Sequence, residues 1–326
     1  MTYPDARIAI IIPVLDDGPS LGKLIDALGR VPAIAAGSAK LIVVDDGSLP
    51  SLQPINTDEA CMLDGEIIRL KRNLGHQRAI AIGLSHVVAT NEAGRVVVMD
   101  GDGEDRPEDV ARILDALNGK DMDCIAVGER ASRSEGLLFT AFYHLYRILF
   151  RVLTGQQIRF GNFLAMTIGS ARRLVDMSEL WLNLPATVIR SRLPIAPVPT
   201  SRGHRYVGTS RMNLVSLVVH GLSAMAVFME RLLTRVILAA AGLAVLGLAA
   251  SLIAIAFKIA GLATPGWMTT VVGTSLVVIV MTGALALIGL IGGLAGSVAV
   301  TTPPAAGHRQ FIAEILPLFE RRTTAT

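Results

Sequence analysis

The residues best suited to chemistry form an acidic turn that follows a short apolar run. Residues 96–99 are apolar, as in a buried parallel strand. The turn after them contains Asp100, Gly101, Asp102 and Glu104. Parallel strands bind ligands beyond their carboxyl ends, so we expect Asp100 and Asp102 at the edge of a crevice. Two carboxylates one residue apart suit a hard divalent cation that also binds substrate phosphates. The alternative is a surface turn whose acids cap the helix that begins at Pro107.

Two further apolar runs end in acidic residues and are expected to lie near this turn. Residues 7–14 are followed by Asp17, and residues 40–44 are followed by Asp46. Helices are predicted between the strands, over residues 21–29 with Ser20 as N-cap, 77–88 and 106–117. Short strands that alternate with helices predict an α/β fold with a doubly wound, mostly parallel sheet.

Several classes of site are absent from the sequence. Neither a GxGxxG nor a GxxxxGK[ST] loop is present, so the sheet does not hold a dinucleotide or a nucleoside triphosphate in those ways. Cys61 and Cys124 lie far apart without a Cys or His cluster, which predicts reduced thiols and no zinc site. The net charge is only +3, and no basic run is interleaved with aromatic residues, so a nucleic-acid partner is not expected.

Two later segments have a basic character. Residues 201–212 carry Arg202, Arg205 and Arg211 beside Ser210, and such a loop is suited to hold phosphate through charge-assisted hydrogen bonds. The alternative is a solvated basic loop near anionic lipid. Residues 137–153 predict a helix rich in Phe, Tyr and Leu that either lies on a membrane surface or packs on the sheet.

The last third of the chain has the composition of membrane-spanning helices. Between residues 236 and 300 the only charged side chain is Lys258. About 20 apolar residues are needed to cross a bilayer. The sequence predicts a domain over residues 1–211, an amphipathic interfacial helix over 212–235, two spans at about 236–257 and 268–300, and a tail over 301–326.

The basic residues around these spans predict their orientation. Arg231 and Arg235 precede the first span, and Arg309, Arg321 and Arg322 follow the second. The connector between the spans carries one lysine. By the positive-inside rule both ends lie in the cytoplasm, which predicts an integral protein of the cytoplasmic membrane with its α/β domain in the cytoplasm.

The chain resembles the family 2 glycosyltransferases of GT-A fold in a set of motifs: IIPVLDD, VVDDGS, NLGHQRAIAIG, VVVMDGDGEDRPE and a late R-x-x-G-x-S-R. With the two C-terminal spans, it is most similar to the polyprenyl-phosphate glycosyltransferases, a group that includes dolichyl-phosphate mannose synthase. The resemblance covers nearly the whole chain. The pair formed by DDGS and the D-x-D turn is its most specific part.

The resemblance implies a role for each residue that matches a family motif. The residues implied to line the donor's base and ribose pocket are Pro13, Leu15, Asp17 and Asp46. Asp100, Gly101 and Asp102 match the D-x-D motif of the catalytic site, with Asp102 and Glu104 on Mg²⁺ or Mn²⁺. The residues implied to hold the donor phosphates are Arg130, Arg205 and Arg211. Together the metal and the arginines neutralise the nucleoside diphosphate leaving group.

One residue departs from the family pattern in the acceptor region, which also includes Ser210. Related enzymes commonly have G-D-F-R where this chain has Gly161-Asn162-Phe163-Leu164. Asparagine accepts no proton at neutral pH, and a sugar hydroxyl acceptor would lose the roughly 10²- to 10⁴-fold contribution of a general base. A lipid phosphate is already ionised near pH 7, so Asn162 is compatible with a phosphate acceptor, although Asp100 or Glu104 offers a base for a different one.

The sequence therefore predicts an inverting, metal-dependent transfer of a sugar from a UDP- or GDP-linked donor to a polyprenyl phosphate at the cytoplasmic membrane face. One alternative keeps the fold and changes the acceptor to another lipid or a lipid-linked saccharide. A second is a membrane-anchored, non-catalytic protein that binds a sugar nucleotide. The sugar, the nucleotide and the existence of a homo-oligomer are left open.

Overall fold

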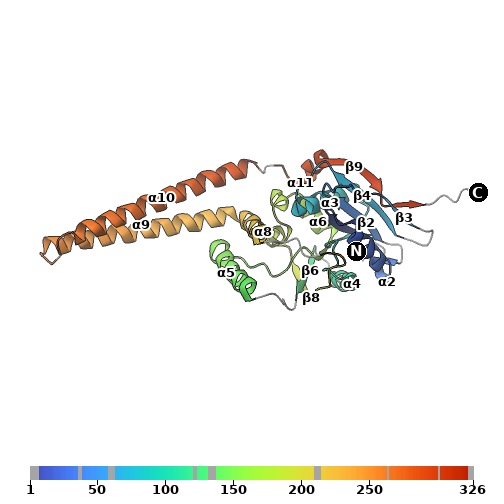
Figure 1. Ribbon diagram of the computed structural model, residues 1–326, viewed down its shortest axis with the longest axis horizontal. Coiled ribbons are helices and arrows are strands. Elements are labelled where there is room, and N and C mark those ends of the chain that lie inside the picture. Colours follow the sequence, from blue (N-terminus) through green and yellow to red (C-terminus); the bar gives the residue numbers. More distant parts are fainter. Residues whose placement is uncertain are drawn as a thin grey trace, which may run out of the picture. The chain divides into compact units, whose positions relative to one another are not determined.

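The computed structural model describes residues 7–35, 39–57, 63–119, 123–130, 137–208, 214–262, 264–299 and 302–321. The chain divides into two units (Figure 1). The first unit comprises Met1–Leu137, Ile158–Val227 and Thr302–Thr326. The second comprises Leu138–Gln157 and Phe228–Thr301. The first unit therefore includes residues from both sides of the two long apolar helices.

An eight-stranded sheet forms the centre of the first unit, in the order β8-β6-β7-β5-β1-β2-β4-β9. The strands are β1 Ile8–Val14, β2 Ala39–Asp45, β4 Asp64–Leu70, β5 Arg95–Val98, β6 Ile125–Arg130, β7 Leu164–Thr167, β8 Ile195–Thr200 and β9 Ile312–Pro317. Only β7 and β9 run antiparallel to their neighbours. The sheet is therefore mostly parallel, and this part of the predicted fold is confirmed.

Helices cover both faces of the sheet because side chains alternate between the faces along each strand. Ile10 and Ile12 of β1 pack with helices α1 Gly18–Leu28 and α4 Pro107–Asp115. Ile11 faces the other way and packs with helices α3 His76–Thr90, α6 Ile168–Val175 and α7 Leu184–Ser191. The shorter elements are α2 Pro32–Ala35, η1 Ser178–Trp181, α11 Pro304–Gly307 and η2 His308–Phe311.

The C-terminal segment belongs to the folded unit, in contrast to the tail predicted over residues 301–326. Strand β9 pairs antiparallel with β4, and β10 Phe319–Arg321 pairs parallel with β3 Ile55–Thr57 (Figure 1). Leu318 between the two strands is fully buried. Arg69 of β4 forms an ion pair with Glu314, which is 245 positions away. No local sequence signal identifies a partner at such a distance.

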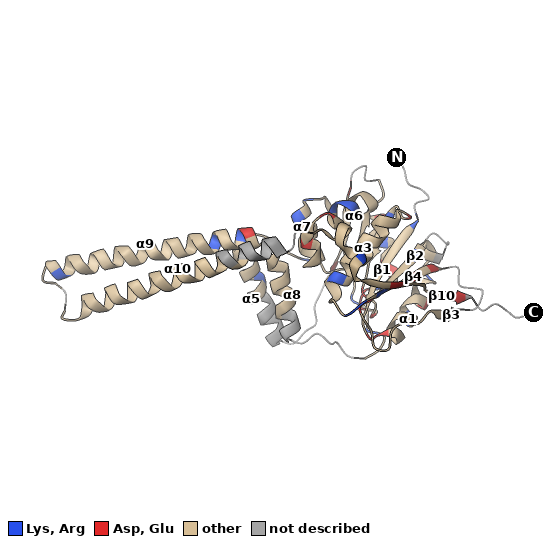
Figure 2. Ribbon diagram, turned by 90° about the horizontal axis from the view of Figure 1, so that it is seen from above, with Lys and Arg blue, Asp and Glu red and all other residues tan. Residues whose placement is uncertain are grey.

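The second unit contains α5 Leu137–Thr154 and the long helices α9 Met229–Ile259 and α10 Trp267–Ala299. The long helices lie side by side and carry charged residues only near the start of α9 and at Lys258 (Figure 2). Gly247 permits close approach, because a Cβ there would lie 3.3 Å from Ile279. Among the described residues, two helical segments are long and apolar enough to cross a membrane, Met229–Ile259 and Trp267–Gly289.

The boundary between the predicted interfacial helix and the first span is placed differently in the structure. Helix α8 Leu214–Ala226 ends before residue 227 and is part of the first unit. Residues 229–235, predicted to end the interfacial helix, are instead the first two turns of α9. Composition could not reveal this break, because the residues on both sides of it are mostly apolar.

Candidate active site

Three neighbouring strands bring their acidic ends to one edge of the sheet. Strand β1 lies between β5 and β2, with Ile11 opposite Val98 and Val14 opposite Asp45. The acidic residues that follow β1, β2 and β5 therefore leave the sheet beside one another. This arrangement confirms that the D-x-D turn lies at a strand end next to the other two acidic segments.

The segment after β8 lies against the acidic turn. The Tyr206 N–H donates to the Asp102 carbonyl at 2.9 Å, and the Gly203 N–H donates to the Glu104 carbonyl at 2.8 Å. These bonds place the Arg205 guanidinium beside two carboxylates, with Nη2 at 3.3 Å from Asp102 Oδ2 and 3.9 Å from Asp17 Oδ2. The structure thus brings together three residues that the sequence assigned to the site.

Gly103 permits this contact between the two segments. It has a φ of +90°, and a Cβ at this position would lie 2.6 Å from two atoms of the Tyr206 ring. Both the backbone conformation and the space therefore favour glycine. Gly101, the middle residue of the D-x-D motif, packs on β1, where a Cβ would lie 3.3 Å from Ile12 and from Val14.

Arg202 forms an ion pair with Glu104 that the sequence did not predict. Its Nη2 donates to both Glu104 oxygens, at 2.9 and 2.8 Å. Arg202 therefore competes with any metal for the Glu104 carboxylate. The metal role of Glu104 stays a prediction that requires Arg202 to move.

The acids of the turn crowd one another. Burial raises the pKa of Asp102, and the negative charges of Asp100 and Glu104 raise it further, although the Glu104 N–H and Arg205 oppose the shift. A bound cation would relieve this crowding. The hard oxygen donors of Asp100 and Asp102 fit Mg²⁺ or Mn²⁺. Among the described residues no three His, Cys, Asp or Glu side chains gather around one point, so substrate or water oxygens would complete the coordination shell.

Asp46 has a structural task in addition to the donor contact predicted for it. Its two oxygens accept the Leu74 N–H at 2.7 Å and the Gly75 N–H at 2.9 Å, directly before α3. The side chain is buried, and burial raises the pKa of Asp46 despite these hydrogen bonds. Asp46 therefore holds the start of α3, and with it His76, beside the acidic strand ends.

His76 and Gln77 link Asp100 to the acceptor region, and the sequence analysis assigned no role to either. His76 Nε2 lies 3.2 Å from Asp100 Oδ1 and 3.0 Å from Asn162 Nδ2. Gln77 Nε2 donates to Asn162 Oδ1 at 3.0 Å. The His76 side chain is 42% exposed, but the protein atoms around the ring partly desolvate it, which lowers the pKa of His76. The charges of Asp100, Asp105 and Asp46 outweigh this effect and raise the pKa overall. The sequence signal that could have identified His76 and Gln77 is their place in the NLGHQ motif.

The remaining residues from the sequence analysis have different positions. Pro13 is buried in β1, and Leu15 is half-buried just beyond that strand. Asp17 is the N-cap of α1 and accepts the Ser20 N–H at 3.4 Å, so Asp17 holds the capping position predicted for Ser20. Three predicted side chains lie outside the described residues: Arg130, whose backbone ends β6, Ser210 and Arg211. Cys124 is a free, buried thiol, and Cys61 also lies outside the described residues.

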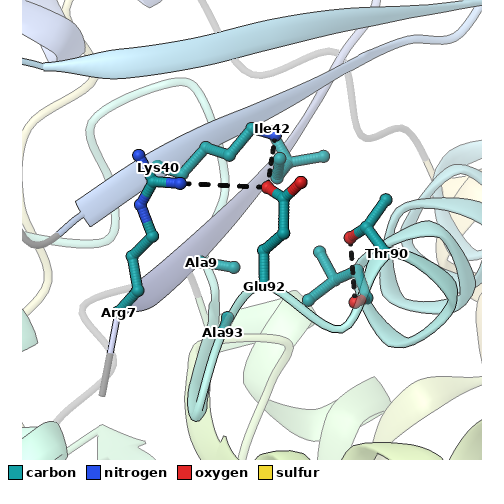
Figure 3. A pocket seen from close by; sticks show the side chains of 8 residues that line it. Arg7, Ala9, Lys40, Ile42, Thr90, Glu92 and Ala93 are labelled. Carbon is teal, nitrogen blue, oxygen red and sulfur yellow. Dashed lines mark hydrogen bonds and ion pairs between the residues drawn. The ribbon is translucent and has the colours of Figure 1, made fainter. Parts of the chain in front are cut away.

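A second charged cluster lies at the opposite, amino ends of the strands (Figure 3). It lines a small hollow whose residues include Arg7 just before β1, Lys40 of β2 and Glu92 after α3. Lys40 Nζ lies 2.9 Å from Glu92 and 3.2 Å from Glu66. Because these opposite charges are paired with one another, the cluster has the character of a structural network.

Comparisons with known proteins identify the family of this chain. Residues 9–177 match the family model described as Glycosyl transferase family 2. The undecaprenyl-phosphate 4-deoxy-4-formamido-L-arabinose transferase of Yersinia pestis (strain Pestoides F) is 25% identical over 79% of this chain and 79% of its own. The transferase of the same description from Salmonella choleraesuis (strain SC-B67) is 23% identical over 66% of this chain and 65% of its own.

Among solved structures, glucosyl-3-phosphoglycerate synthase from Mycobacterium tuberculosis, in complex with Mn²⁺, UDP and glucosyl-3-phosphoglycerate, aligns with a TM-score of 0.49 and 17% identity. The alignment covers 70% of this chain and 81% of that one. The family match spans more than half of the chain and includes the acidic ends of β1, β2 and β5. The chain therefore belongs to glycosyl transferase family 2.

Proposed function

We propose that this glycosyltransferase moves one sugar from a nucleotide-sugar donor to a polyprenyl phosphate at the cytoplasmic face of the membrane, with inversion at the anomeric carbon. The main support for this proposal is the contact of Arg205 with Asp102 and Asp17 at the acidic strand ends. The same chain has two helices that are long and apolar enough to span a membrane. Relatives whose names specify undecaprenyl phosphate support a lipid phosphate acceptor.

Donor binding is assigned to the acidic turn and the segment that contacts it. Asp102, with Asp100 beside it, would hold Mg²⁺ or Mn²⁺, which when bound supplies positive charge to the diphosphate leaving group. Arg205 adds a guanidinium that is already placed at the turn, at 3.3 Å from Asp102. When the bond from the anomeric carbon to the diphosphate breaks, the electron pair stays on the diphosphate, and these positive groups stabilise it.

The acceptor side requires no general base. An oxygen of the ionised lipid phosphate attacks the anomeric carbon from the side opposite the diphosphate, so one C–O bond forms as the other breaks. Asn162 lies beside His76, which contacts Asp100, and this contact supports the proposal that Asn162 belongs to the acceptor region. Asparagine at this position is consistent with an acceptor that brings no proton to remove.

The membrane assignment rests on the second unit and on the chain's connectivity. Residues before α9 and after α10 both belong to the first unit, so the two ends of the helical hairpin lie on the same side of a bilayer. Within the second unit, Ile148 and Val152 of α5 are 62% and 60% exposed, and Arg235 donates to the carbonyls of Arg151 and Val152. This exposed apolar surface supports the option in which α5 contacts lipid. The cytoplasmic side follows from the positive-inside rule.

The test is a panel of radiolabelled UDP- and GDP-sugars incubated with membranes that contain the protein, with and without added undecaprenyl phosphate. We expect one donor to give a lipid product only when undecaprenyl phosphate is present and a divalent cation has not been chelated. Mild acid should release the sugar, because a glycosyl phosphate is labile. Membranes with Asp102→Asn are the matched control.

The alternative acceptor, another lipid or a lipid-linked saccharide, predicts an acid-stable glycoside. A product that forms without added undecaprenyl phosphate and resists mild acid would favour it. The family assignment and the glycosyltransferase relatives argue against the non-catalytic alternative.

A further inference from the structure

A chain of three amide groups runs from a helix start to the acceptor side of the site. Leu184 is the first residue of α7, and its backbone N–H donates to Gln77 Oε1 at 2.7 Å. Gln77 Nε2 donates to Asn162 Oδ1 at 3.0 Å. Asn162 Nδ2 then lies 3.0 Å from His76 Nε2. We call Leu184, Gln77 and Asn162 the amide relay.

The direction of the relay is fixed by its first member. A backbone N–H can only donate, and the first N–H groups of a helix have no partner within that helix. Gln77 must therefore turn its oxygen to Leu184 and its nitrogen to Asn162. Asn162 must in turn accept with its oxygen, which leaves its NH₂ group on the side of His76. His76 Nε2 lies 3.2 Å from Asp100 Oδ1 and directs its own proton there, so His76 does not take up the Asn162 N–H groups and they remain for a ligand. The orientation of both side-chain amides thus follows from one backbone group.

This orientation matters because the surroundings are acidic. His76 Nε2 lies 3.2 Å from Asp100 Oδ1, and Asp102 follows two residues later. Two negatively charged groups repel each other at such distances. An anionic acceptor that approaches this edge needs N–H donors, and a reversed Asn162 would present an oxygen instead. His76 is 42% exposed and Asn162 is only partly buried, so an acceptor can reach both.

We propose that Gln77 is a positioning residue for the acceptor, which sets the Asn162 side chain so that its N–H groups meet the acceptor phosphate. The proposal rests on the proposed function, since it requires an anionic acceptor. Gln77 itself touches no substrate and acts through Asn162. The chemistry recognised is a phosphate monoester carried by a lipid.

Gln77→Glu is the sharpest variant. A glutamate at position 77 still accepts the Leu184 N–H, so α7 keeps its partner, but it cannot donate to Asn162 Oδ1. Asn162 would then turn its nitrogen to residue 77 and its oxygen to His76. We expect KM for undecaprenyl phosphate to rise about tenfold, the loss expected for one hydrogen bond to a charged group. The kcat and the KM for the sugar nucleotide should stay near the wild-type values. The lost contact binds the acceptor equally in the ground state and the transition state, so its loss raises only the KM for the acceptor.

Two controls separate positioning from structure. Gln310→Glu makes the same chemical change at an exposed residue and should leave every parameter unchanged. A double-mutant cycle with Asn162→Ala tests the route: once Asn162 is gone, Gln77→Glu should add no further rise in acceptor KM. A similar tenfold rise in both backgrounds would overturn the proposal, as would a lower Tm with an unchanged acceptor KM.

Calorimetric titration of the detergent-solubilised protein with undecaprenyl phosphate separates this proposal from the proposed function. If the wild-type protein binds the lipid but transfers no sugar to it, and Gln77→Glu weakens this binding about tenfold, the proposed function is wrong and the proposed role of Gln77 is supported. If the wild type transfers sugar and the variant binds the lipid equally well, the relay fails. If the wild type neither binds nor transfers to the lipid, both are wrong.

Discussion

Two partly buried carboxylates at opposite ends of the parallel sheet have opposite electrostatic surroundings: Glu66 lies in β4, and Asp102 follows β5. At the amino end, Glu66 lies 3.2 Å from Lys40 and 2.5 Å from His86. Burial raises the pKa of Glu66, but these two partners outweigh burial, and the pKa is lowered overall. At the carboxyl end, burial raises the pKa of Asp102, and the acidic neighbours Asp100 and Glu104 raise it further, so the pKa is raised overall.

The difference lies in the charged partners of the two carboxylates. Glu66 and Asp102 have similar exposed side-chain fractions, 16% and 18%, so burial alone does not separate them. Their partners do. The amino end balances its charges internally and adds to the stability of the fold, whereas the described acids of the D-x-D turn at the carboxyl end repel one another, as expected where a cation is proposed to bind.

The largest expected effect is that of Asp102→Asn. Turnover should fall about 10³-fold, because the electrostatic stabilisation of the leaving group is lost. The Tm at pH 7 should be unchanged or higher. A carboxylate whose pKa is raised by folding lowers stability as pH rises through that pKa, and asparagine removes this cost while its oxygen can still accept the Glu104 N–H.

The measurements for this variant are turnover with the identified donor and thermal unfolding at pH 7. Asp115→Asn on the exposed side of α4 makes the same change away from the site and should alter neither. Turnover of Asp102→Asn within a few-fold of wild type would remove the role assigned to this carboxylate.

The second expected effect is on stability at the amino end. Glu66→Gln should lower the free energy of unfolding by about 1–2 kcal/mol, between the values typical of exposed and buried ion pairs. The Tm should fall by a few degrees, with turnover retained. A lowered pKa stabilises the fold above the ordinary glutamate range and loses this contribution as the pH falls, so the difference between wild type and variant should shrink below about pH 4.5.

Thermal unfolding from pH 3 to pH 8 checks this prediction. Glu108→Gln is the control, since Glu108 is 66% exposed and its pair with Arg106 is a surface contact. A constant difference in Tm across this pH range would contradict the ion-pair explanation.

The smallest expected effect concerns the competition for Glu104. Arg202→Gln releases both Glu104 oxygens, and if Glu104 is a metal ligand, the Mg²⁺ or Mn²⁺ concentration for half-maximal turnover should fall by about threefold, the scale of a partly exposed ion pair. Metal titration of turnover measures it, with Arg30→Gln at an exposed position as control. A higher metal concentration for half-maximal turnover would indicate that the Glu104–Arg202 pair instead holds the segment after β8 against the acidic turn.

Local sequence was sufficient for the parts of the fold that rest on local patterns. Apolar runs at 7–14, 40–44 and 96–99 correspond to β1, β2 and β5, and the acids after them lie at adjacent strand ends. A buried strand requires apolar residues whatever its partners are, so its position can be read before the sheet order is known. The two long apolar helices follow from composition for the same reason.

Tertiary structure decided which side chains meet. Arg202 and Glu104 are 98 positions apart, Gln77 and Asn162 are 85 apart, and β9 closes the sheet against β4 from the far end of the chain. Residue type shows that each side chain can form an ion pair or a hydrogen bond, but it does not select the partner. The sequence by itself therefore determined the acidic strand ends, the two apolar helices that are long enough to span a membrane, and the family. The fold decided that Glu104 faces an arginine and that Asn162 directs its nitrogen to His76, because those contacts depend on distant segments packed side by side.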